Sequence, residues 1–138
     1  MKATRRNARE WAIQMLTAAD LNPPEDLSAM MAGFWEGLVE SKPSSGLRAF
    51  AEERVVGVMS SLKELDGLLE PLLEHWDLYR LGTVERAVLR MGIWEIAHSD
   101  VPAPVVINEA VDLVNWFSSP KSRTIVNGVL DKYAKSRS

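Results

Sequence analysis

Apolar residues recur along most of this chain at intervals of three and four positions, which is the spacing of an amphipathic α-helix rather than the alternation of a strand. The first such stripe covers residues 5–19 and ends at Asn22-Pro23-Pro24, because proline cannot continue a helix. Six more stripes follow, separated by breaks rich in Pro, Gly and Ser, and they cover residues 25–40, 47–62, 65–76, 83–98, 104–117 and 122–132. The pattern predicts an all-α domain of seven short helices and no strand.

The last stripe, SRTIVNGVLDK, carries Asn127-Gly128 at its centre, where glycine costs ~1 kcal/mol relative to alanine. Either Gly128 lets another backbone come close, or Asn127 presents an amide where one is needed. We interpret the pair as structural. Gly128 would remove a side chain where the last helix crosses a neighbour, and Asn127 would reach polar groups across that crossing.

Length and composition are those of one globular domain, with 138 residues, 46% hydrophobic and 25% charged. No apolar run approaches the ~20 residues that span a bilayer, so no membrane association is expected. The basic N-terminus is not followed by the apolar segment of a secretory signal. The chain has no cysteine, which excludes disulfides and thiolate chemistry and suits a reducing cytoplasm.

The net charge of −3 hides a strong segregation. Residues 2–9 and 121–137 together hold nine basic residues and one acid, net +8, whereas residues 10–120 hold 18 acids and seven basic residues, net −11. Such a division favours an anionic partner at the two ends of the chain and a basic partner for the middle. The sequence therefore predicts that cations from both ends converge into one phosphate-attracting surface.

The N-terminal cations oppose local helix stability. Arg5, Arg6 and Arg9 fall in the first two turns of a predicted helix, where the macrodipole disfavours each nearby cation by ~0.3–1 kcal/mol. Arg5 and Arg9 share a face at i, i+4 spacing and would suit consecutive phosphates. The alternative is that these arginines are solubilising or pair with acids elsewhere in the chain.

Catalytic and metal-binding patterns are poorly represented. The two histidines, His75 and His98, lie in different segments without metal-ligand spacing, and Glu109 and Asp112 on one helix are interpreted as a solvated face. No nucleophile elbow or phosphate-binding glycine loop occurs. We expect no enzyme activity, no cofactor and no metal. A desolvated pocket containing Glu109, Asp112 or His98 would instead support an enzymatic function.

Three stretches carry a family resemblance: RRNAREWAIQML at 5–16, VERAVLRMGIWEI at 84–96, and VPAPVVINEAVDLVNWF followed by VNGVLDK between 101 and 132. In this combination the chain resembles the NusB family of bacterial transcription antitermination factors. The resemblance implies an all-α, seven-helix NusB-like fold, in which an N-terminal three-helix bundle packs on a C-terminal four-helix subdomain, with subdomains at about 1–63 and 64–138.

The resemblance also implies partners and site residues. Members of the family bind boxA-type single-stranded RNA together with the ribosomal protein NusE, support rRNA transcription within an RNA polymerase antitermination complex, and are not enzymes. Glu85 falls where relatives face NusE. The residues expected to contact RNA are the N-terminal cations and the loop before the last helix: Lys2, Arg5, Arg6, Arg9, Ser119, Lys121, Ser122 and Arg123.

The chain departs from the family at several positions. Many relatives have aromatic residues where this chain has Thr17, Leu72 and Ile125, a glycine where it has Ser118, and an acid where it has Lys121. Stacking on an aromatic is worth ~1–3 kcal/mol per base, so RNA binding is expected to become more electrostatic and more sensitive to salt. The alternative function is a helical protein–protein adaptor of the same fold with weak or lost RNA binding.

A homodimer is a further alternative. It would be favoured if the second helix carried more apolar surface than one small core can bury, leaving a patch formed by Met30, Met31, Phe34 and Trp35. Packing of these side chains into the core is the competing interpretation.

Overall fold

The computed structural model describes residues 2–38, 42–74, 76–117 and 119–137, and within these ranges the chain forms seven α-helices, one 3-10 turn and no strand. This confirms the predicted fold class. The helices are α1 (Arg5–Leu21), α2 (Leu27–Gly37), α3 (Ser45–Ser60), α4 (Leu62–Leu73), α5 (Thr83–His98), α6 (Ala103–Phe117) and α7 (Pro120–Ser136), and the 3-10 turn η1 (Leu78–Arg80) precedes α5. His75 and Ser118 lie outside the described residues.

The helix starts follow ordinary capping chemistry. The Asp26 carboxylate accepts a hydrogen bond from the Ala29 backbone N–H at 3.1 Å and begins α2, and the Ser44 hydroxyl accepts one from the Leu47 N–H at 3.2 Å and begins α3. Thr83, whose residue type and position predict an N-cap for α5, is instead its first helical residue, after Gly82. Pro71 lies inside α4, near its C-terminal end.

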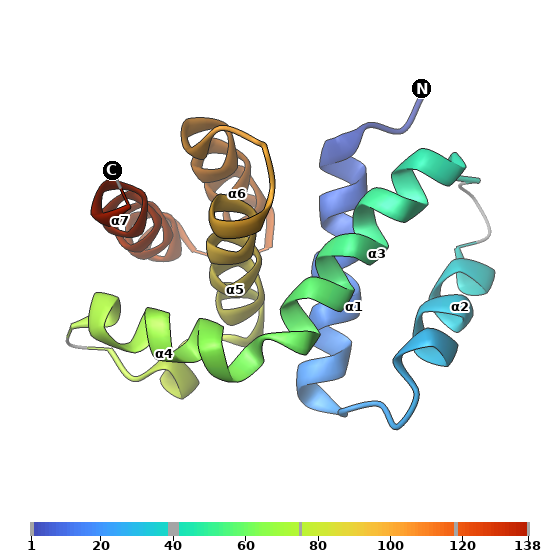
Figure 1. The fold of residues 1–138 in the computed structure, drawn as a ribbon, viewed down its shortest axis with the longest axis horizontal. Coiled ribbons are helices and arrows are strands. Elements are labelled where there is room, and N and C mark those ends of the chain that lie inside the picture. Colours follow the sequence, from blue (N-terminus) through green and yellow to red (C-terminus); the bar gives the residue numbers. More distant parts are fainter. Residues whose placement is uncertain (1, 39–41, 75, 118, 138) are drawn as a thin grey trace.

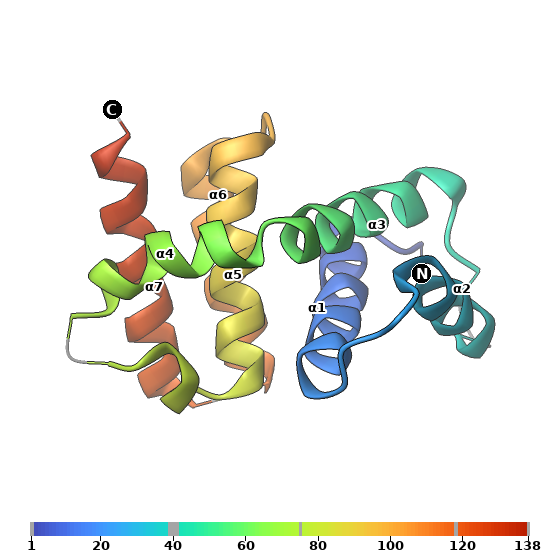
Figure 2. The same ribbon diagram turned by 60° about the horizontal axis from the view of Figure 1, so that its bottom comes forward.

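The helices form two groups that meet along α5. The first group contains α1, α2 and α3, and the second contains α4 to α7, as Figures 1 and 2 show from two directions. Within the first group α1 packs on α3, and within the second α6 packs on both α5 and α7. Helix α5 contacts α1 and α3 on one side and α4, α6 and α7 on the other, which explains why all of residues 87–95 are buried. The predicted subdomain boundary near residue 63 stays a prediction, although the helices do break at Ser61.

The apolar residues of α2 pack inward. Met31 and Trp35 are buried, and Met30 and Phe34 are half-buried against the core. Trp35 meets the Trp11 ring edge-to-face at 5.7 Å between ring centroids and donates a hydrogen bond to Glu52 at 3.3 Å. The exposed apolar patch that a homodimer through these four side chains would require is therefore not present.

Close approach of helices occurs at two other glycines, which corrects the prediction for Asn127 and Gly128. Both of these residues are exposed, and a Cβ built on Gly128 meets no atom within 4 Å. The tight contacts are at Gly57 on α3 and Gly92 on α5. A Cβ at Gly57 would come within 2.2 Å of the Trp94 ring, and one at Gly92 within 2.8 Å of Leu130 on α7.

Gly128→Ala should consequently stabilise the chain rather than disturb a crossing. Its site is an exposed helix interior with open space, so the gain in helix propensity of roughly 0.5–1 kcal/mol is unopposed. Chemical denaturation with urea measures this change in the free energy of unfolding. A loss of stability would restore the close-crossing interpretation.

Candidate nucleic-acid interface

Two cations are exposed at the start of the chain, Lys2 before α1 and Arg5 as its first residue. Lys2 and Arg5 are exposed, and neither contacts a carboxylate in the part of the chain that the structure describes. The Arg5 guanidinium carbon lies 4.9 Å from the centroid of the Phe50 ring on α3, which directs the arginine toward the side of α1 that faces α3. Lys2 and Arg5 can therefore bind a phosphate without first breaking an ion pair with a carboxylate.

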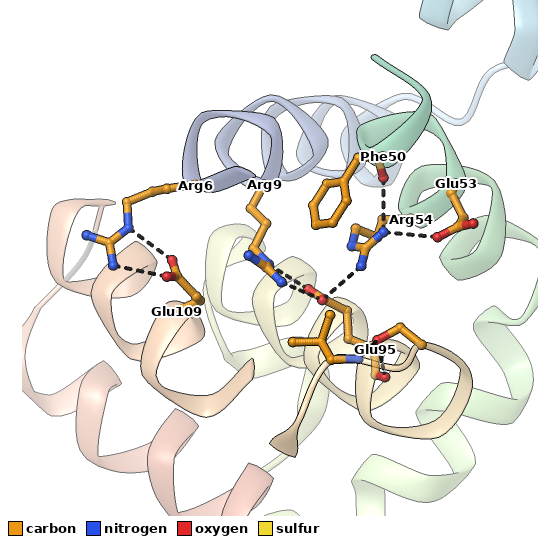
Figure 3. A network of polar contacts seen from close by, with 9 residues as sticks. Arg6, Arg9, Phe50, Glu53, Arg54, Glu95 and Glu109 are labelled. Carbon is orange, nitrogen blue, oxygen red and sulfur yellow. Dashed lines mark hydrogen bonds and ion pairs between the residues drawn. The ribbon is translucent and has the colours of Figure 1, made fainter. Parts of the chain in front are cut away.

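Arg6 is exposed but already paired. Its Nε donates to Glu109 at 2.9 Å (Figure 3). Its NH2 donates to Asp112 at 2.7 Å, so Arg6 joins α1 to α6. The hydrogen bond to Glu109 raises the pKa of Arg6 above its ordinary value. Because all three side chains are partly in solvent, these ion pairs stabilise the fold by at most ~1 kcal/mol. A phosphate that binds Arg6 must displace these carboxylates, so Arg6 offers less net attraction than Arg5.

Arg9 is buried, which contradicts its predicted role as an RNA contact. Only 4% of its side chain is exposed, and its guanidinium makes a two-point ion pair with Glu95 on α5, at 2.9 and 2.8 Å. Arg54 on α3 donates to the same carboxylate at 3.2 Å (Figure 3). We call Arg9, Arg54 and Glu95 the buried ion cluster. It joins α1 and α3 to α5 and positions the start of α1 without facing solvent.

An open groove runs beside the free cations. It encloses about 500 Å³ between α1 and the first turns of α6, and its lining is Thr4, Arg5, Arg6, Arg9, Val101, Val105 and Glu109. Of its three arginines, Arg6 pairs with Glu109 and Arg9 with Glu95. Arg5 is therefore the one lining cation without a carboxylate contact among the described residues, and it gives the groove its attraction for an anion. The N-terminal groove therefore has the charge and access that a phosphate backbone requires.

The second predicted basic segment lies at the start of α7. Lys121, Arg123 and Ser119 are exposed, and neither of the two cations contacts a carboxylate among the described residues. The Lys121 ammonium instead lies 4.8 Å from the centroid of the Trp76 ring. Ser122 is buried and donates a hydrogen bond to Glu85 at 3.0 Å.

Glu85 is therefore not a surface residue. Its exposed fraction is 8%, and its carboxylate accepts the Ser122 hydroxyl from inside the molecule. This corrects the expectation that Glu85 itself faces a protein partner. The contact instead fixes the start of α7 against the first turn of α5.

The two basic zones do not converge, which corrects the prediction of one continuous surface. Arg5 shares a pocket with His98, at the C-terminal end of α5, whereas Ser122 contacts Glu85 at its N-terminal end. At 1.5 Å per residue these ends of α5 are roughly 20 Å apart. The intervening α6 carries Glu109 and Asp112, so the zones are separated by acids as well as by distance.

Aromatic groups are available on the surface, although not where the family pattern would place them. Thr17, Leu72 and Ile125 are half-buried. Trp116 at the end of α6 is 77% exposed, and Trp76 is also exposed although its spacing places it in an apolar stripe. Sequence reasoning missed Trp116. Its position just before a Ser-Ser-Pro break is the one signal that could have indicated exposure.

The described residues form no group of side chains that could hold a metal ion. No three of their His, Asp and Glu side chains are grouped as metal ligands. Glu109 and Asp112 both pair with Arg6, and His98 packs against the Trp94 ring at 5.8 Å between centroids. Among the helices described, none is long and apolar enough to traverse a bilayer.

Comparison with known proteins agrees with this architecture. The NusB family model matches residues 6–135. Curated relatives named transcription antitermination protein NusB include one from a Nitratiruptor species, 39% identical over 96% of this chain and 93% of the relative, and one from Helicobacter pylori, 33% identical over 96% and 94%.

Solved structures show the same fold. NusB of T. maritima superposes with a TM-score of 0.86 at 29% identity, over 98% of this chain and 93% of that one. A structure of the antitermination factors NusB and NusE in complex with double-stranded RNA gives a TM-score of 0.83 at 28% identity, with 96% of each chain covered.

Proposed function

The chain belongs to the NusB family, and on that premise we propose that it is a non-enzymatic transcription antitermination factor that binds boxA-type single-stranded RNA together with NusE. In this proposal it acts in the cytoplasm, within an RNA polymerase antitermination complex that supports rRNA transcription. A similar protein, crystallised with NusE and double-stranded RNA, supports the partnership.

The observation that carries the RNA-binding part is the N-terminal groove with Arg5 in its lining. Arg5 and the nearby Lys2 are exposed and contact no carboxylate among the described residues, in a chain whose net charge is negative. Phosphate neutralisation supplies most of the affinity in non-specific nucleic-acid binding, and it needs such free cations. Arg6 can add a contact by exchanging Glu109 and Asp112 for a phosphate.

The start of α7 is proposed as a second RNA contact, through Ser119, Lys121 and Arg123. Because this zone lies roughly 20 Å from Arg5 along α5, one strand must extend over several nucleotides to reach both. Ser122 is left out as a direct contact, since its hydroxyl is buried against Glu85. Its proposed role is to hold the zone in place.

NusE is proposed to bind the acidic part of the surface, although not through Glu85. The middle of the chain carries a net charge of −11 over residues 10–120, which suits a basic ribosomal protein. A protein–protein adaptor that has lost RNA binding would use the same surface, so the RNA measurement decides between the two functions.

Replacing Arg5 by alanine should weaken RNA binding and flatten its salt dependence. Each phosphate contact on a single strand contributes ~0.7 to the slope of log affinity against log salt, so Arg5→Ala should lower the slope by about that amount. Fluorescence anisotropy with a labelled boxA-type RNA at saturating NusE measures both quantities, over a salt range from about 50 to about 200 mM.

The matched control is Arg80→Ala, which removes an exposed arginine of η1 that contacts no carboxylate in the described residues. This variant should bind RNA as the parent chain does. If the parent chain gives no RNA-dependent signal even with NusE present, the adaptor is the better function.

A further inference from the structure

A second pocket adjoins the N-terminal groove, between α3 and the turn that joins α5 to α6. It encloses about 340 Å³ and shares Arg5 and Val101 with the groove, so a strand in the groove passes its mouth. Its volume lies near the lower end of the range for small-molecule sites, which suits one aromatic ring system. Its lining is Arg5, Phe50, Glu53, Arg54, His98, Ser99, Asp100 and Val101, of which Arg5, Arg54, Glu53 and Asp100 carry formal charges.

The charge of this pocket is balanced, unlike that of the groove. Arg5 and Asp100 are exposed, and Asp100 has no ion-pair partner among the described residues. The cation of Arg54 is already used by Glu95 and Glu53, at 3.2 and 3.1 Å (Figure 3). A phosphate would therefore meet two carboxylates and only one available guanidinium. A neutral ring with both donors and acceptors fits better.

The lining of the pocket provides an apolar surface together with hydrogen-bond donors and acceptors. Phe50 is half-buried, and its ring is held by the Arg54 guanidinium, whose central carbon lies 3.5 Å from the ring centroid. Arg5 brings hydrogen-bond donors and Asp100 brings acceptors. Single-stranded RNA is recognised in this way, through bases splayed out of the strand and read on their edges.

Guanine is the base that matches this arrangement. An arginine donates two hydrogen bonds to O6 and N7 of guanine, and a carboxylate can accept from N1–H and the 2-amino group on another edge of the same ring. Uracil has one N–H donor between two carbonyl oxygens, so these oxygens would face the acceptor oxygens of the carboxylate. Cytosine offers a single amino group. Only guanine presents paired donors and paired acceptors together.

We propose that the pocket formed by Arg5, Phe50, Glu53, Arg54 and Asp100 binds one guanine base of the RNA whose phosphates lie in the N-terminal groove. In this arrangement one edge of the Arg5 guanidinium donates to O6 and N7 while its remaining N–H donors contact a phosphate in the groove, and Asp100 accepts from N1–H and the 2-amino group. The inference rests on the RNA-binding function proposed above and adds a base preference to it.

Asp100→Asn tests the proposal because base recognition and electrostatics predict changes of opposite sign in RNA affinity. Loss of base recognition weakens binding of the guanosine probe, whereas loss of a negative charge strengthens binding of any RNA. The probes are labelled oligouridines of about 12 nucleotides, within the range of single-strand site sizes, with and without one central guanosine. They are titrated at one salt concentration with saturating NusE. The parent chain should bind the guanosine probe at least about fivefold more tightly. Asp100→Asn should abolish that preference, while its affinity for the all-uridine probe rises slightly because a negative charge is lost near phosphates.

Two controls sharpen the result. A probe with inosine in place of guanosine lacks only the 2-amino group and should bind with intermediate affinity. Glu70→Gln, which neutralises an exposed acid on α4, should keep the guanosine preference.

The failures of the two proposals are distinguishable. Equal affinity of the parent chain for both probes, or equal tightening of both by Asp100→Asn, overturns the guanine pocket and leaves RNA binding in place. Binding of a boxA-type RNA but of neither probe overturns the pocket alone, whereas failure of the boxA-type RNA to bind at low salt overturns the RNA-binding function and the pocket with it.

Discussion

Glu95→Gln is expected to lower the free energy of unfolding by about 3–5 kcal/mol, because it leaves Arg9 buried without a counter-charge and leaves the buried Arg54 with only the exposed carboxylate of Glu53. Arg9, Arg54 and Glu95 are each at most 4% exposed, and no other carboxylate in the described residues approaches Arg9. The glutamine keeps the shape of the side chain, so the loss reports charge rather than a cavity. Urea denaturation followed by circular dichroism measures it.

Glu53→Gln is the matched control for this result. The Glu53 carboxylate pairs with the same Arg54 at 3.1 Å but is 64% exposed, so its loss should cost less than ~1 kcal/mol. A second variant, Arg9→Met combined with Arg54→Met and Glu95→Leu, should recover most of the stability, because apolar groups of similar volume can replace a buried ion cluster. If Glu95→Gln costs no more than Glu53→Gln, the cluster does not hold the two helix groups together.

Gly57→Ala should destabilise the chain by about 1–3 kcal/mol, although alanine is the better helix former. The added Cβ would lie 2.2 Å from Cε2 of Trp94, and Trp94 cannot retreat easily because it is buried in the core. The same measurement of unfolding by urea applies. The Arg54 guanidinium carbon lies 5.7 Å from the Trp94 ring centroid, so movement of the ring also disturbs the buried ion cluster.

Gly67→Ala provides the comparison for Gly57→Ala. It adds the same methyl group to a helix interior, on α4, where a Cβ meets nothing within 4 Å. It should therefore stabilise by roughly 0.5–1 kcal/mol. Equal effects of the two substitutions would show that α3 and α5 are not in the close contact described.

The helices could be predicted because their signal is local. Each stripe repeats at helical spacing, and the breaks contain proline, glycine or a capping residue such as Asp26 or Ser44. Only the helix boundaries differ from the prediction. Thr83 became a helical residue instead of a cap, and α2 began at Leu27, after its capping aspartate.

The sites of individual charges could not be predicted in the same way, because burial depends on what a helix packs against. Arg9 is in a basic segment, yet α1 contacts both α3 and α5, and this double contact buries a wider face than the stripe of Ala8, Trp11 and Ala12 indicates. A local sign did exist at Glu95. It is a lone acid between Trp94 and Ile96, where a carboxylate needs a buried cation.

The positions of Gly128 and Glu85 could not be predicted from their motifs, because a motif does not specify which side of a helix is buried. The Asn127-Gly128 pair interrupts an apolar stripe, and a crossing was the natural explanation, but the pair lies on the side of α7 that faces solvent. Glu85 is in the first turn of a helix, where acids are common, so sequence alone did not distinguish an exposed acid from one that binds Ser122.

The buried ion cluster also determines how the molecule melts. Its carboxylate belongs to α5, whereas its two guanidinium groups belong to α1 and α3. If either helix group unravelled first, the other would be left with stranded charge on a newly exposed apolar face, an intermediate of high free energy. We therefore expect the chain to unfold in one cooperative transition, without a stable intermediate in which only one helix group is folded.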